Sequence, residues 1–191
     1  MDKYETHEHD VIVIGAGGAG LRAAIEASSR GVGVGLICKS LLGKAHTVMA
    51  EGGVAAALRN TDSRDSWEVH FRDTMRGGKM LNNWRMAQLH AQESPARVDE
   101  LEEWGALFDR TEDGRILQRN FGGHRYARLA HVGDRTGLEI IRTLQNYGIH
   151  QGIEVYMECT VLDLLKDGDR VSGALGDAAI GGAVEQGAPF L

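Results

Sequence analysis

The sequence contains little cysteine and almost no proline. Cys38 and Cys159 lie far apart and form no CxxC pair, so zinc sites and disulfide scaffolds are poorly supported. Two buried thiols in a reducing cytoplasm are expected instead. Proline occurs only at Pro95 and Pro189, whereas glycine occurs 26 times, a composition that suits tight turns and close approach of the backbone to a ligand.

Two further absences narrow the class of protein. No run approaches the roughly 18 apolar residues that a membrane helix requires, and the charged first ten residues do not resemble a signal peptide. The formal charge of -6 provides no broad basic surface, which argues against nucleic acid or anionic lipid as a direct partner. We therefore expect a soluble, cytoplasmic chain with no direct membrane insertion and no nucleic-acid partner.

A βαβ unit is predicted near the N-terminus. The continuous β-branched run at 10–14 (DVIVI) is typical of a parallel strand covered on both faces. Helix formers follow at 21–30 and stop at Gly31, and the apolar run at 32–38 predicts the second strand.

The remainder of the chain predicts an α/β domain with a helical and β-hairpin insertion. Ser94 followed by Pro95 is typical of a new helix start. The expected elements are helices at 66–75, 84–93, 95–104 and 136–147, a hairpin turn at Asp113-Gly114, and strands at 153–165 and 171–175. The last fifteen residues, 177–191, indicate a loose tail.

The strongest chemical motif is Gly15-x-Gly17-x-x-Gly20, which directly follows the first strand and opens the helix. Gly15 permits the tight turn, Gly17 lets the backbone approach a pyrophosphate, and Gly20 lets the helix pack on the strand. The motif favours dinucleotide binding over a purely structural turn. The cofactor-binding residues predicted from it are Gly15, Ala16, Gly17, Gly18, Ala19 and Gly20.

The end of the second strand bears on which dinucleotide binds. An NAD site, and many FAD sites, would place Asp or Glu there to hold the ribose hydroxyls, but this sequence has Cys38 and Lys39. That argues against ordinary NAD binding. An unusual FAD site and an NADP site, whose extra phosphate Lys39 could attract, both remain open.

The stretch 45–53 (AHTVMAEGG) resembles a segment of the succinate dehydrogenase and fumarate reductase flavoprotein family, and Lys39 resembles that family's Ser-Lys. The resemblance extends from about His9 to about Gly176. Further matching segments are Met75-Arg76-Gly77-Gly78, Leu101-Glu102-Glu103-Trp104-Gly105, Gln118-Arg119-Asn120-Phe121-Gly122-Gly123-His124 and Asp134-Arg135-Thr136-Gly137.

The resemblance implies a Rossmann-like, glutathione-reductase-like FAD-binding domain. It also implies that His46 is joined covalently to the flavin in the complete protein. Glu51 where the family usually has Gln is a mild departure, and Cys38 where it has Ser removes a good hydrogen-bond donor. The further cofactor-binding residues are Cys38, Lys39, Ser40, Ala45, His46, Thr47, Ala50, Gly52 and Gly53.

The family's activity is implied in the same way. Succinate would lose a hydride to flavin N5 and a proton to a base, giving fumarate, or the reverse. The implied partners are an iron-sulfur subunit and membrane-anchor subunits. Through these partners the complete protein would be associated with the cytoplasmic face of the membrane. The family's dicarboxylate-binding groups lie in a capping domain and beyond, so no catalytic residue is assigned here. The resemblance implies that His124 and Arg125 lie in a segment that approaches the substrate side of the flavin, and a role of His124 in ordering the loop is an equally good alternative.

The expected organisation is an incomplete FAD-binding domain at 1–176 and a divergent tail at 177–191, without the capping and C-terminal helical domains. A truncation, a frame change or a cut chain would each explain this, and we expect the chain to be inactive alone. Two alternatives remain, an L-aspartate oxidase and a non-catalytic FAD-binding remnant. The L-aspartate oxidase pattern has no linking histidine, so His46 distinguishes the two enzymes. An NADP reductase would leave 45–53 unexplained. His7 and His9 near the terminus do not indicate a metal site.

Overall fold

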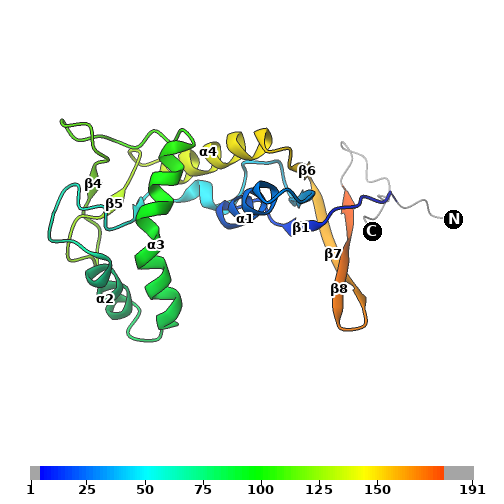
Figure 1. Cartoon of the computed structure of the whole chain (residues 1–191), viewed down its shortest axis with the longest axis horizontal. Coiled ribbons are helices and arrows are strands. Elements are labelled where there is room, and N and C mark those ends of the chain that lie inside the picture. The colour runs from blue at the N-terminus through cyan, green and yellow to red at the C-terminus, as the bar shows by residue number, and fades with distance from the viewer. Residues whose placement is uncertain (1–4, 179–191) are drawn as a thin grey trace. The chain divides into compact units, whose positions relative to one another are not determined.

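A computed structural model describes residues 5–178. The chain divides into two units, of which unit 1 comprises Met1–Thr47 and Leu144–Leu191 and unit 2 comprises Val48–Thr143. The tail expected from Asp177 onward falls outside the described residues after Ala178. Figure 1 gives the order of the helices and strands along the chain.

Unit 1 contains a parallel sheet in the order β1 (Val11–Ile14), β2 (Val34–Ile37) and β6 (Glu154–Tyr156). Helix α1 (Gly18–Ser29) connects β1 to β2, which confirms the predicted βαβ unit and the α/β class. All four residues of β2 are buried, because a central parallel strand is covered on both faces.

The strand expected at 153–165 is interrupted, so that prediction was wrong in its continuity. Glu158 has φ +54, a left-handed conformation that ends β6 and lets β7 (Cys159–Asp167) begin in a new direction. Strand β7 forms an antiparallel hairpin with β8 (Arg170–Ala178), and the turn contains Gly168 at φ +60. The hairpin is seen in Figure 1.

Unit 2 combines two packed helices with a small antiparallel sheet (Figure 1). The Oγ of Ser66 accepts a hydrogen bond from the N–H of Val69 and caps the first helix. The elements are α2 (Trp67–Gly77), α3 (Trp84–Glu103), β3 (Val54–Ala55), β4 (Gln118–Arg119) and β5 (Leu129–Ala130). Helix α4 (Thr136–His150) and the short 3-10 helix η1 (His46–Met49) each contribute residues to both units.

Helix α3 runs without a break through Pro95, so the helix start expected at Ser94 was wrong. The Oγ of Ser94 is buried and has no partner among the described residues, and therefore it caps nothing. Ala87, Ala91 and Val98 are buried on the same face. Packing of this face outweighs the hydrogen bond that Pro95 cannot donate.

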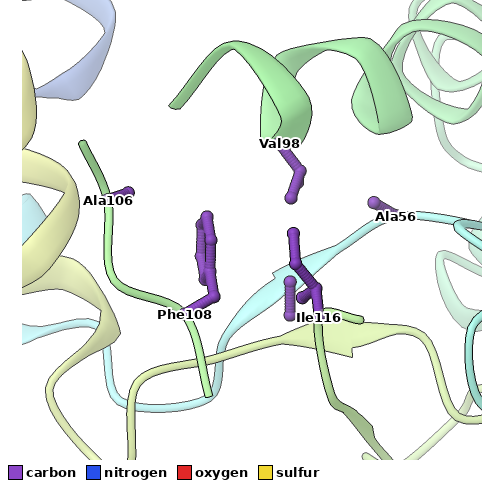
Figure 2. Close-up of a cluster of buried hydrophobic side chains, with 6 residues drawn as sticks. Ala56, Val98, Ala106, Phe108 and Ile116 are labelled. Carbon is purple, nitrogen blue, oxygen red and sulfur yellow. The ribbon is translucent and has the colours of Figure 1, made fainter. Parts of the chain in front are cut away.

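The core of unit 2 forms where α3 covers the sheet and the segment 104–117, which follows α3 in the chain. Figure 2 shows Val98 directed toward Ile116, with the Phe108 ring beside them in this cluster. The predicted turn at Asp113-Gly114 is confirmed by the bridge between Arg110 and Ile116. The buried cluster consists of Ala56, Val98, Ala106, Phe108, Ile116 and Ala130.

Candidate functional site

The glycine-rich turn between β1 and α1 requires glycine at two of its positions. Gly15 has φ +105, which side chains rarely adopt. A Cβ placed on Gly20 would lie 1.8 Å from the carbonyl oxygen of Gly15. The start of α1 therefore packs against the end of β1 as closely as the motif predicts.

Gly17 is the N-cap of α1 and has no side chain to satisfy the first backbone donors of the helix. Within residues 5–178, no acceptor is bonded to the N–H groups of Ala19 and Gly20. The N–H of Gly18 donates to Thr47 Oγ1 at 3.2 Å. Open donors at the positive end of a helix dipole are suited to bind a phosphate.

The segment 45–47 lies against this turn. A Cβ on Gly17 would lie 3.5 Å from Thr47 Oγ1 and 3.9 Å from the Ala45 Cβ, both ordinary contacts. His46 begins η1, and its side chain is exposed. The fold thus brings together the glycine motif and the Ala45–Thr47 segment, which the sequence separates by about 25 residues.

The end of β2 is hydrogen-bonded to the end of β6 and to the start of β7. The N–H of Cys38 donates to the Tyr156 carbonyl at 2.9 Å, and its own carbonyl accepts from the Cys159 N–H at 3.0 Å. Burial raises the pKa of the Cys38 thiol, which is therefore a neutral, apolar group. Lys39 and Ser40, which follow it, are exposed and accessible to a ligand.

The remaining candidate residues, Ala50, Gly52 and Gly53, belong to unit 2. Gly53 has φ +113, and a Cβ there would approach the Ala130 carbonyl oxygen to 2.7 Å. A Cβ on Gly52 would lie 3.5 Å from the Phe121 ring. The packing of this loop on the sheet therefore already requires glycine at Gly53, apart from any role toward a cofactor.

A buried charged cluster in unit 2 was missed by reasoning from the sequence. Arg128 is fully buried, and its Nη2 lies 2.8 Å from Asp65 Oδ1 and 3.0 Å from Asp73 Oδ2. Its members are separated by up to 63 positions, so no motif spacing could have indicated them. His124 lies in this neighbourhood, with its ring centroid 5.9 Å from that of His70.

The part of the chain that the structure describes contains neither a candidate metal site nor a helix that could cross a membrane. No group of three or more His, Cys, Asp or Glu residues at 5–178 is arranged to hold a metal ion. Among the helices within these residues, none combines the length and the apolar character needed to cross a membrane.

The sequence profile of the FAD binding domain family matches residues 10–186. A fumarate reductase (CoM/CoB) protein from Methanothermobacter marburgensis is 46% identical over 173 residues, which cover 90% of this chain and 32% of that protein. The mitochondrial succinate dehydrogenase [ubiquinone] flavoprotein subunit of Oryza sativa subsp. japonica is 40% identical, with 85% of this chain and 27% of that protein covered.

Solved structures agree with these relatives. The apo Sdh1 complex of Mycobacterium smegmatis contains a chain with 62% identity and a TM-score of 0.89, covering 91% of this chain and 32% of that one. A quinol fumarate reductase of E. coli superposes with a TM-score of 0.85 at 36% identity, with 91% and 30% covered.

The fold and the glycine turn define a dinucleotide-binding α/β protein. More particularly, the chain belongs to the FAD binding domain family, and FAD is the cofactor that this family indicates. The relatives and structures named above are succinate dehydrogenase and fumarate reductase proteins, as the resemblance implied. The chain spans about a third of the length of the curated relatives it matches.

Proposed function

We propose that this chain is the FAD-binding part of a longer flavoprotein that oxidises succinate to fumarate or catalyses the reverse reaction. The observation that carries the proposal is the open N-terminus of α1, where Gly17 provides no side-chain cap and the Ala19 and Gly20 donors have no bonded acceptor at residues 5–178. The family match and the named relatives support FAD as the molecule that uses these donors.

The residues of unit 1 divide the work of holding FAD. The amides at the start of α1 bind the pyrophosphate, and Thr47 Oγ1, already bonded to the Gly18 N–H, closes one side of the turn. Lys39 adds a positive charge at the exposed end of β2. Bound FAD would supply a two-electron acceptor, which these residues position.

His46 is proposed as the covalent attachment point for the flavin in the longer protein. Its exposed imidazole lies one residue before Thr47 and therefore close to the glycine turn. A neutral imidazole nitrogen is nucleophilic near neutral pH. The test is flavin fluorescence that remains with acid-precipitated protein and disappears in His46→Ala; fluorescence that persists in the variant would assign the linkage to another residue.

The longer protein is proposed to form a complex with an iron-sulfur subunit and with membrane-anchor subunits. These subunits would hold it at the cytoplasmic face of the membrane. The similarity to chains of an Sdh1 complex and a quinol fumarate reductase supports this assembly. Co-purification of an iron-sulfur protein with the longer polypeptide is the expected result. A longer polypeptide that purifies alone, active with quinone, would contradict it.

Gly17→Ala is the sharpest test of FAD binding. Gly17 has φ -77, which alanine readily adopts, and its new Cβ would meet only ordinary contacts, so the chain should fold. The added methyl group would occupy the place where the pyrophosphate approaches the backbone. We expect the purified variant to lose FAD, measured by absorbance and by titration with the cofactor.

Gly148→Ala is the matched control within unit 1. Its Cβ would also meet only ordinary contacts, of which the nearest is 3.5 Å from Ile153. This variant should bind FAD as the unmodified chain does. Equal FAD affinity in Gly17→Ala and in the control would refute binding at the glycine turn.

A further inference from the structure

Arg119, in strand β4 of unit 2, holds the loop at 51–53 from one side. Its Nε donates to the Gly52 carbonyl at 3.0 Å, and its Nη2 donates to the carbonyl of the adjacent residue, Glu51. The third nitrogen, Nη1, lies 3.2 Å from Asp134 Oδ1. One guanidinium therefore binds two successive peptide groups across a separation of 67 residues or more.

A planar trans peptide directs its C=O and N–H to opposite sides. When Arg119 binds the carbonyls of Glu51 and Gly52, it therefore turns the N–H groups of Gly52 and Gly53 away from itself. Within residues 5–178 these two N–H groups have no bonded acceptor. The clamp thus presents two adjacent donors with fixed direction.

The flanks of the loop are held independently of Arg119. The carbonyl of Ala50 accepts from the Gly137 N–H at 2.7 Å, and Val54 pairs with Ala130 in the sheet. Between these anchors, Arg119 binds the two central carbonyls of the loop. Loss of the guanidinium would therefore release the two central peptides without unpairing the strand.

We propose that Arg119 is a positioning residue that preorganises the Gly52 and Gly53 donors for a hydrogen-bond-accepting edge of the flavin. The inference rests on the proposed FAD function, since Gly52 and Gly53 are candidate cofactor residues. Arginine suits the task because its rigid fork reaches two carbonyls at once, whereas lysine offers a single point charge.

The clamp itself is tested by the backbone NMR order parameters of the cofactor-free chain. Arg119→Gln should lower the order parameters of the Gly52 and Gly53 amides from about 0.85 to below about 0.6, because the central peptides lose their fixed orientation. The matched control is Arg142→Gln: Arg142 also bonds a loop carbonyl, that of Gly105, and a carboxylate, that of Glu139. Order parameters at 51–53 that are unchanged in Arg119→Gln, or equally lowered in the control, overturn the proposal.

The role toward the cofactor is tested by FAD titration of the same variants. We expect about tenfold weaker binding in Arg119→Gln, partial recovery in Arg119→Lys, and no change in Arg142→Gln. Lower order parameters with unchanged FAD affinity and an unchanged visible spectrum of the bound flavin would overturn the positioning role. An unmodified chain that binds no FAD would instead refute the proposed function, and the order parameters would still decide whether the clamp exists.

Discussion

Acidification from about pH 7.5 to about pH 5 is expected to destabilise the folded chain through His70. Only 1% of this residue is exposed, and its Nδ1 has no partner among the described residues. Burial lowers the pKa of His70 from 6.5 to about 3; Arg128, His90 and His124 also lower it, and Asp73 acts in the opposite direction. The folded state therefore keeps His70 neutral over a pH range in which the unfolded chain binds a proton.

The sign and size of the effect follow from this difference in pKa. Because the folded pKa lies below the unfolded value, the contribution of His70 is fully present above pH 6.5 and is lost as the pH falls toward 3. At about pH 5 the unfolded state gains about 2 kcal/mol from binding this proton. The lowered pKa of His124 acts in the same direction, whereas burial raises the pKa of Asp65 and opposes the effect.

The assay is urea unfolding of the unmodified chain and of His70→Gln at the two pH values. The variant removes the titratable imidazole of His70 and leaves Asp65 and His124 in place. The difference between the pH dependence of the unmodified chain and that of the variant therefore isolates His70. His150→Gln, which alters an exposed histidine, is the control. If His70→Gln loses as much stability between the two pH values as the unmodified chain, the buried neutral histidine is not the cause.

Three further predictions concern the glycine turn, the core and catalysis. Gly20→Ala should prevent unit 1 from folding, because its Cβ would lie 1.8 Å from the Gly15 carbonyl oxygen; a native circular dichroism spectrum would contradict this. Phe108→Ala should destabilise unit 2 by about 3–5 kcal/mol in chemical unfolding, since Phe108 is buried in the cluster of Figure 2, and a cost below about 1 kcal/mol would show that the site collapses freely. The 191-residue chain loaded with FAD should not oxidise succinate with an artificial acceptor, because a dicarboxylate needs cationic partners and a proton-transfer group that the resemblance assigns elsewhere; measurable turnover would refute this.

The glycine turn could be predicted from the sequence because its determinants are local. Gly15, Gly17 and Gly20 follow a β-branched run and precede helix formers, and the chemistry of each position depends on residues within one turn. The segment 45–53 could be recognised in the same way, as a contiguous pattern. The assignment of individual residues to FAD contacts stays a prediction that the proposed variants test.

Propensity failed where packing over a distance decides the outcome. Ser94 and Pro95 have the local signature of a helix start, yet the buried face of α3 continues through them. The apolar run at 153–165 has no local signal strong enough to show that Glu158 adopts a left-handed conformation between β6 and β7. The error at Ser94 arises because short-range preference is weaker than the burial of a continuous surface.

The sequence by itself determined the α/β class, the βαβ unit and the family, because periodicity and contiguous motifs carry them. Only the tertiary structure brought Arg119 to the carbonyls of Glu51 and Gly52, and only it buried Arg128 between Asp65 and Asp73. Side chains more than 50 positions apart have no spacing rule in the sequence. Their contacts depend on how strands and helices pack, so only the tertiary structure reveals the hydrogen bonds that orient the loop at 51–53.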